Sequence, residues 1–296
     1  MKSPPLIIGH RGACGYAAEN TLASAALAHA QGADLVELDV ILSRDGELVV
    51  CHDLYLDDLT DVSPRFPGRA RADGLTYILD LDWTELCTLR VGPRHDGTPA
   101  PRVFPPQPLA TLDQHLGQLA TLNDSTGRRV ELYLELKSPA WHADAGRDLC
   151  AAALACLTRH NLTRATDPVI VESFDPAALK RLRFEFKSKL RLTQLIGENA
   201  WREADCDCDI MRTPSGLRDI ATYAQAVATN LDHATAPFVR AAHAVGLDVH
   251  AYTFRADALP AGFVTTETAL HFLFNETGLD GLFTDQPDVV ARFLRR

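Results

Sequence analysis

Short apolar segments alternate with alanine-rich segments along the whole chain, and this alternation constrains the fold more than any other feature. The apolar segments have the length of β-strands, and most are separated by stretches typical of helices. Such alternation predicts a parallel sheet, and eight strand–helix units can close into a (β/α)8 barrel. The predicted strands are Leu6 to Ile8, Asp34 to Leu42, Leu48 to Cys51, Val130 to Leu136, Val169 to Ser173, Leu190 to Leu195, Ala226 to Asn230, Val249 to Thr253 and Gly281 to Thr284.

The predicted set contains nine strands, one more than the barrel requires. Its second and third strands are joined by Ser43-Arg44-Asp45-Gly46, and Asp-Gly between apolar segments is typical of a β-hairpin. We therefore expect an α/β fold, a TIM (β/α)8 barrel whose strands 2 and 3 form an antiparallel hairpin. If Asp45-Gly46 is a two-residue turn, Arg44 lies opposite Glu47 and Asp39 lies opposite His52.

The alternation is interrupted after His52-Asp53 by a segment rich in Pro, Arg, Gly and Asp, which runs from Leu54 to Pro108. A long irregular insertion after a strand end is usually a functional lid or a small subdomain, although a merely tolerated surface loop is the alternative. We predict that residues 1–296 form a single barrel domain in which residues 54–108 are an inserted lid or small subdomain.

Composition and charge exclude some classes of partner. The formal net charge is −10, and an acidic surface repels phosphate backbones, so we expect no nucleic-acid partner. No stretch of about 18 apolar residues is present, so we expect no stable membrane insertion. The chain reaches its first strand without a signal-peptide segment, which predicts a cytoplasmic protein. A periplasmic or secreted protein whose leader had been removed would have the same sequence. The sequence carries no signal for oligomeric state.

Charged residues gather at the C-terminal ends of predicted strands, where barrel active sites are built. Glu37 and Asp39 are two apart in an apolar strand, so both side chains leave the same face. Because unpaired buried carboxylates are costly, a divalent cation between them would resolve the conflict. Glu135 supplies a third carboxylate, with Lys137 on the same face of its strand. Ion pairing with Arg11 and Lys137, without a metal, is the alternative.

Two histidines, His10 and His52, follow predicted strands at the same end of the barrel. Carboxylates for a metal ion, cations for a phosphate and histidines for proton transfer together suit phosphoryl transfer. A structural role for each histidine is the alternative.

Several motifs in order resemble the signature of the glycerophosphodiester phosphodiesterases. The first blocks are Gly9-His10-Arg11-Gly12, Glu37-Leu38-Asp39 and Cys51-His52-Asp53. Similar later blocks are Glu135-Leu136-Lys137, Ser173-Phe174-Asp175, Tyr252-Thr253-Phe254 and Gly281-Leu282-Phe283-Thr284-Asp285-Gln286-Pro287. The resemblance covers nearly the whole chain, and the insertion is similar to that of the bacterial periplasmic branch.

This resemblance implies metal-dependent hydrolysis of a small-molecule glycerophosphodiester, such as glycerophosphocholine, to sn-glycerol 3-phosphate and an alcohol. It implies that His10 and His52 are the general acid and base and that Arg11 and Lys137 bind the phosphate. The implied ligands of one divalent metal ion are Glu37, Asp39 and Glu135. In the branch that the chain most resembles the ion is Ca²⁺, and in others it is Mg²⁺. Attack by a neighbouring glycerol hydroxyl, through a cyclic phosphate, and direct attack by water both fit the sequence.

Four further residues are candidates for supporting roles. Phe174, Tyr252 and Phe254 are predicted to bind substrate as the wall of the alcohol pocket, with packing in the core as the alternative. Glu19 precedes a helix predicted from Asn20 to Gln31. It is either an acidic residue favoured by the helix dipole or a residue that supports the site behind its ligands.

Two other functions fit the same pattern less well. A lysophospholipase D-type phosphodiesterase acting on lysophospholipids would need a wide apolar entrance, which the charged segment from Arg65 to Asp73 does not provide. A catalytically inactive binding module would have lost a histidine or a carboxylate, and all of these are present.

Overall fold

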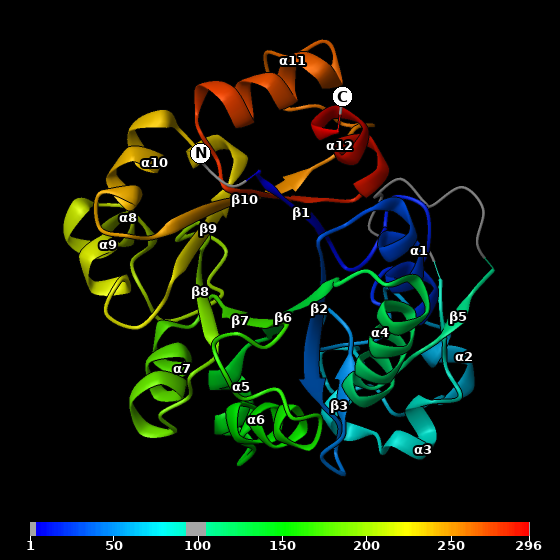
Figure 1. Cartoon of the computed structure of the whole chain (residues 1–296). Helices are drawn as coiled ribbons and strands as arrows, with labels where there is room; N and C mark the ends of the chain where they lie inside the picture. The colour runs from blue at the N-terminus through cyan, green and yellow to red at the C-terminus, as the bar shows by residue number, and fades with distance from the viewer. Residues whose placement is uncertain (1–3, 93–104, 296) are drawn as a thin grey trace.

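The computed structural model describes residues 4–92 and 105–295. A ring of eight strands is surrounded by helices, which Figure 1 shows in a view along the barrel axis. Neighbouring strands in the ring are parallel, and β1 pairs with both β2 and β11 to close it. The predicted (β/α)8 barrel is therefore confirmed. The ring strands are β1 (Leu6–Gly9), β2 (Leu35–Leu42), β6 (Glu131–Leu136), β7 (Val169–Ser173), β8 (Arg191–Ile196), β9 (Ala226–Asn230), β10 (Asp248–Phe254) and β11 (Gly281–Thr284).

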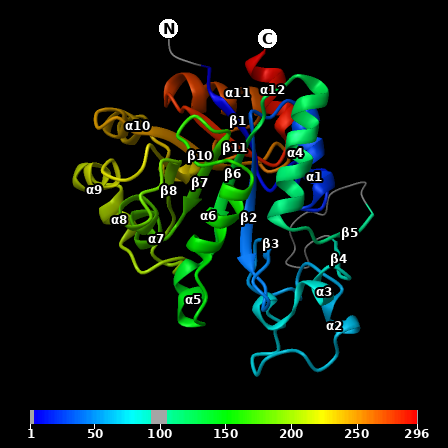
Figure 2. The ribbon, with the colours of Figure 1, turned by 60° about the horizontal axis from the view of Figure 1, so that its bottom comes forward.

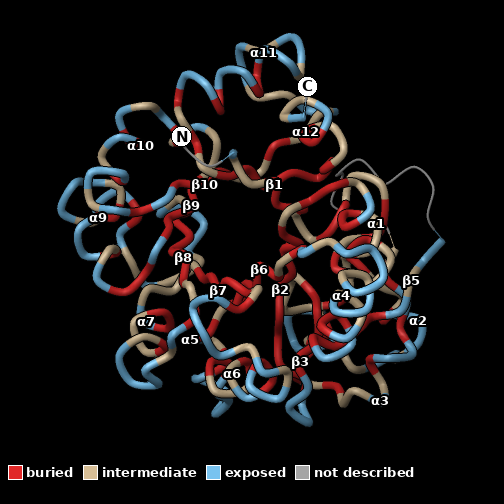
Figure 3. Tube along the Cα trace, in the orientation of Figure 1, coloured by how far each residue is buried: buried red, intermediate tan, exposed pale blue. Residues whose placement is uncertain are grey.

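The helices lie outside the ring, with their outer faces exposed and the strands buried (Figure 3). None of those in the described ranges has the length and apolar character needed to cross a membrane. The α-helices outside the insertion are α1 (Leu22–Gln31), α4 (Leu112–Thr126), α5 (Pro139–Asp144), α6 (Leu149–Arg159), α7 (Pro176–Lys180), α8 (Cys208–Met211), α9 (Pro214–Ile220), α10 (Ala236–His243), α11 (Thr266–His271) and α12 (Pro287–Leu294). Further helical segments, which are not α-helical, are η2 (Arg181–Glu185), η3 (Leu231–His233) and η4 (Phe272–Glu276).

The interior of the barrel is filled by one compact apolar cluster. Its buried members include Ile8, Tyr133, Ile170 and Phe283, each from a different strand. Because side chains two apart along a strand share a face, the residues that follow this cluster toward the C-terminal ends also point inward. Charged residues in that next layer therefore face the barrel mouth.

The β2–β3 connection is the predicted antiparallel hairpin, but its register differs by one residue from the prediction. β3 (Leu48–Val50) pairs Val50 with Val40 and Leu48 with Leu42. The loop therefore has three residues, Arg44 to Gly46, and Gly46 takes the left-handed conformation (φ 92°) that such loops require. As a result Asp39 lies opposite Cys51, whose N–H donates to the Asp39 carbonyl, rather than opposite His52.

The insertion has its own small core. Its elements are α2 (Val62–Arg65), η1 (Ile78–Asp80), α3 (Trp83–Leu86), β4 (Arg90–Val91) and β5 (Gln107–Pro108). Apolar residues such as Leu56, Leu59 and Leu86 pack together and against Ile41 and Val49 of the hairpin. In Figure 2 these elements lie together beside the hairpin, at the end of the barrel away from both termini. Residues 93–104 of the predicted insertion lie outside the described residues.

One buried histidine of the helical layer has consequences for stability. His115 of α4 is 2% exposed and packs beside Val36 and Leu38 on the outer side of β2. Burial lowers its pKa from 6.5 to about 4. The folded state therefore holds the neutral form, while the unfolded chain binds a proton between these two pH values. This contribution to stability is complete above about pH 6.5 and is lost as the pH falls toward 4.

We predict that His115→Leu makes the stability of the protein less sensitive to acid. Between pH 7 and pH 5 the wild type should lose about 2 kcal/mol more unfolding free energy than the variant does. Urea unfolding of both proteins at the two pH values measures this difference. An equal loss in the two proteins would show that His115 is not held neutral by the fold.

Candidate active site

A pocket of about 180 Å³ opens at the C-terminal end of the barrel, where charged and aromatic side chains from most of the ring converge. Eight of the residues singled out from the sequence line it: His10, Arg11, Glu37, His52, Glu135, Lys137, Phe174 and Tyr252. The two ends of the chain thus meet at one site, because β1 pairs with β11 when the barrel closes.

Three buried carboxylates from neighbouring strands form one wall. Each of Glu37 on β2, Glu135 on β6 and Glu172 on β7 offers an oxygen within 4.8 Å of the others. Burial, followed by repulsion from neighbouring carboxylates, raises the pKa of Glu37 and Glu172 well above its usual value. Burial is also the main cause that raises the pKa of Glu135 to about 8. The atoms that could bind a metal ion here are all carboxylate oxygens, which hard divalent cations prefer as ligands.

Glu172 was missed by the sequence analysis. It is directly in register with Glu135, which in turn is in register with Asp39. A signal existed, since Glu172 is an acidic residue in the apolar strand Val-Ile-Val-Glu-Ser and lies two residues after the inward-facing Ile170.

Asp39 adjoins this group but has different partners. Its Oδ2 accepts a hydrogen bond of 2.8 Å from Asn20 Nδ2, and its backbone N–H donates to Asn20 Oδ1. Burial would raise the pKa of Asp39, but the positive charges of Lys137 and Arg11 and the hydrogen bond from Asn20 outweigh it and hold the pKa below its usual value. Asp39 is therefore ionised. In the sequence, Asn20 was only the first residue of a predicted helix. The helix instead begins at Leu22, and Thr21 caps it by accepting from the Ser24 N–H.

Two cations flank the carboxylates. Lys137 Nζ lies 2.8 Å from Glu135 Oε1, and Arg11 Nη1 lies 2.8 Å from Glu19 Oε1. The backbone N–H of Arg11 also donates to Glu37 Oε2 at 2.7 Å. Burial would lower the pKa of both cations, but the neighbouring carboxylates raise it above its usual value, so both are charged. Glu19 is thus placed behind Arg11, at a distance from the carboxylate wall.

The ring of His52 contacts a carboxylate on one side and an ammonium group on the other. Its Nδ1 lies 2.5 Å from Asp53 Oδ1, and its Nε2 lies 3.2 Å from Lys137 Nζ. Burial, then the charges of Arg11 and Lys137, lower the pKa of His52 well below its usual value. Because the ammonium group of Lys137 can only donate, Nε2 is the acceptor and Nδ1 carries the hydrogen of a neutral ring.

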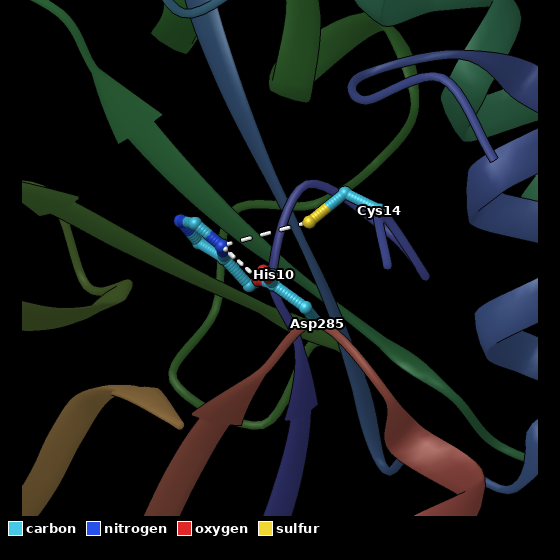
Figure 4. A group of neighbouring side chains, drawn as sticks. All are labelled: His10, Cys14 and Asp285. Carbon is cyan, nitrogen blue, oxygen red and sulfur yellow. Dashed lines mark hydrogen bonds and ion pairs between the residues drawn. The ribbon is translucent and has the colours of Figure 1, made fainter. Parts of the chain in front are cut away.

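His10 is oriented from the other end of the chain. Figure 4 shows its ring facing Asp285, which follows β11, and the Cys14 sulfur. His10 Nδ1 lies 2.8 Å from Asp285 Oδ1 and 3.8 Å from Cys14 Sγ. Burial would raise the pKa of Asp285, but its hydrogen bond with His10 lowers it. Asp285 lay within a motif noted in the sequence, but its contact with His10 depends on closure of the barrel.

Aromatic side chains form another part of the pocket lining. Phe174 and Tyr252 meet edge to face with their ring centroids 6.0 Å apart, and Lys137 Nζ lies 5.6 Å from the Phe174 centroid. The lining also includes residues that were not predicted: Leu195, Trp201, Glu203, Thr253 and Phe283. Trp201 and Glu203 belong to the loop between β8 and α8.

Phe254 differs from its prediction as part of this lining. It is fully buried and packs in the outer core, among residues that lie between the strands and the helices. The pairing of β10 with β11 is irregular between Ala251 and Phe254, so the alternation of sides that links Tyr252 to Phe254 is broken there.

Comparisons with known proteins agree on one family. Residues 10–289 match the model of the glycerophosphoryl diester phosphodiesterase family. A glycerophosphodiester phosphodiesterase of Haemophilus influenzae is 34% identical, over 100% of this chain and 91% of the relative. One from Treponema pallidum is 32% identical, over 99% of this chain and 92% of the relative. The crystal structure of a Silicibacter pomeroyi protein assigned as a glycerophosphoryl diester phosphodiesterase superposes with a TM-score of 0.78. It is 26% identical and is matched over 100% of this chain and 94% of its own.

The family match extends over almost the whole barrel, from His10 at the end of β1 into α12. It therefore includes both histidines, the carboxylate wall and Asp285. The chain belongs to the glycerophosphoryl diester phosphodiesterase family and is an enzyme of that family.

Proposed function

We propose that this enzyme hydrolyses small glycerophosphodiesters such as glycerophosphocholine to sn-glycerol 3-phosphate and an alcohol, using a divalent cation and histidine acid–base catalysis. The observation that carries the proposal is the convergence of buried carboxylates, two cations and two oriented histidines in one pocket. The length of the family match supports the choice of reaction.

The carboxylate wall fits a divalent cation. Glu37 and Glu135, with Asp39 beside them, would hold it, and their crowding in a buried site would be relieved by its charge. When bound, such an ion polarises a phosphoryl oxygen and offsets its charge. Ca²⁺ and Mg²⁺ both prefer oxygen ligands. We propose that the bound ion is Ca²⁺, with Mg²⁺ as the alternative.

The cations of the site would bind the phosphate. Arg11 Nε is buried and makes no hydrogen bond within the part of the chain that is described. Lys137 lies between Glu135 and His52, so a phosphate near His52 would also be within reach of its ammonium group. Guanidinium and ammonium groups are both suited to this role, since they stay charged and donate several hydrogen bonds.

The two histidines have environments that suit opposite roles. His52 is neutral with an accepting Nε2, so it can take the proton of the attacking hydroxyl, whether that belongs to the glycerol or to water. His10 can give a proton from Nε2 to the leaving oxygen, while Asp285 orients its ring and stabilises the positive charge that it carries before transfer. Proton removal and proton delivery then occur on different sides of the phosphate.

We predict that the activity depends on a metal ion. Chelator-treated protein should release no glycerol 3-phosphate from glycerophosphocholine, and added Ca²⁺ should restore release more effectively than added Mg²⁺. A coupled assay for glycerol 3-phosphate measures this. Full activity after chelation would contradict the metal requirement. Release of choline from lysophosphatidylcholine, with glycerophosphocholine left intact, would indicate the lysophospholipase D-type reaction instead.

Each histidine should be needed for turnover. We expect His10→Ala and His52→Ala each to lower kcat by about 100-fold or more, since a general acid or base typically contributes that much. Circular dichroism and the Tm of each variant check that the fold is kept. His271→Ala is the matched control, because this side chain is 60% exposed on α11, away from the pocket. Unchanged turnover in either active-site variant would refute the role of that histidine.

Asp285 should act through His10. We predict that Asp285→Asn lowers kcat by about 100-fold with little change in KM, because the amide cannot stabilise a charged imidazole. Asp285→Glu, which keeps the charge, should recover part of the loss. The control is Asp257→Asn, which removes a nearby carboxylate that contacts Arg255 and Gln286. A rise in KM at constant kcat would instead point to substrate binding.

A further inference from the structure

Glu172 stands out among the buried groups of the barrel. Its side chain lies on β7, is 1% exposed and lines the pocket. Its Oε2 is buried and has no hydrogen-bond partner in residues 4–92 and 105–295. A buried carboxylate oxygen without a donor is costly unless a ligand completes it.

Lys137, a cation of the same pocket, makes no hydrogen bond with this oxygen. Lys137 Nζ is engaged by Glu135 Oε1 at 2.8 Å and by His52 Nε2 at 3.2 Å. Glu172 instead clusters with two further carboxylates, Glu37 and Glu135, and an oxygen of each of the three lies within 4.8 Å of the others. Strand pairing fixes this approach, since Glu172 is in register with Glu135.

We propose that Glu172 is a further ligand of the divalent cation, alongside Glu37 and Glu135. The proposal rests on the cation site of the proposed function and extends it to a residue on a third strand. Asp39 has one oxygen less available to a cation than a free carboxylate has, because its Oδ2 accepts a hydrogen bond of 2.8 Å from Asn20 Nδ2. Glu172 offers an oxygen that nothing else in the described structure uses.

An additional carboxylate also bears on which ion is bound. Ca²⁺ takes about six to eight oxygen ligands in flexible geometry, whereas Mg²⁺ keeps several waters and is usually bound through one or two carboxylates. A wall of three glutamates with a neighbouring aspartate therefore suits Ca²⁺ better. Loss of Glu172 should weaken the binding of Ca²⁺ more than the binding of Mg²⁺.

Calorimetric titration of the full-length, chelator-treated chain with Ca²⁺ and, separately, with Mg²⁺ tests the proposal. Glu172→Gln keeps the size of the side chain and removes one ligand charge. We expect it to raise the Kd for Ca²⁺ by about 100-fold, since even outer partners of metal ligands are worth about 10- to 100-fold. Glu203→Gln is the matched control, because Glu203 lines the same pocket but is not one of the three clustered glutamates. It should change the Kd by less than about threefold, as expected for a charge near solvent.

The Tm of each protein, measured with and without Ca²⁺, distinguishes a loss of Ca²⁺ binding from a folding defect. Added Ca²⁺ should raise the Tm of the wild type and of Glu203→Gln clearly more than that of Glu172→Gln. If Glu172→Gln does not fold, Glu172→Asp retracts the carboxylate while keeping its charge and should weaken Ca²⁺ binding in the same direction. A Kd for Ca²⁺ within about threefold of wild type in the folded variant would overturn the role of Glu172 and leave the metal requirement standing. Wild-type protein that binds neither ion would overturn both.

Discussion

The barrel mouth holds more buried negative charge than its own cations neutralise, and the arrangement of the site depends on that excess. Four carboxylates lie on three adjacent strands, whereas the cations beside them are Arg11 and Lys137. The four are Glu37, Asp39, Glu135 and Glu172. Because they project from paired strands rather than from loops, they cannot relieve their repulsion by turning toward solvent. The excess is relieved by protons on some of these carboxyl groups or, as we propose, by a bound cation.

The charged groups around the pocket also give the two histidines different electrostatic surroundings. His52 stands on the side of the cations, and the positive charges of Arg11 and Lys137 add to burial in disfavouring a further positive charge on its ring. His10 instead lies against Asp285, a carboxylate that can accept from Nδ1 and balance a charged ring. These different surroundings fit the roles that we propose, with His52 as the proton acceptor and His10 as the proton donor. A substrate phosphate lying between them would face both, with its negative charge toward the cations.

Sequence patterns were sufficient for the barrel and for most of the pocket, and they failed where position depends on pairing. Strand and helix periodicities predicted all the ring strands, and inward-facing alternation placed Glu37 and Glu135 together. The hairpin register was misassigned because two- and three-residue loops both accept Asp-Gly. In addition, β2 is buried on both faces, so its apolar pattern does not indicate which residues of β3 pair with it. Contacts such as His10 with Asp285 join residues 275 positions apart and follow only from closure of the ring.

The insertion contacts the β2–β3 hairpin and does so outside the pocket. β3 is a short strand on the outer edge of β2, and a strand this short holds its position poorly alone. Two contacts secure it: the Val50 N–H donates to the Ala110 carbonyl just after the insertion, and the hairpin loop is fixed by Arg44, which pairs with Asp82. None of the described residues of the insertion lines the pocket, yet its apolar cluster buries Cys51, the residue before His52. The insertion therefore supports the segment that leads to His52, the residue that we propose as the catalytic base.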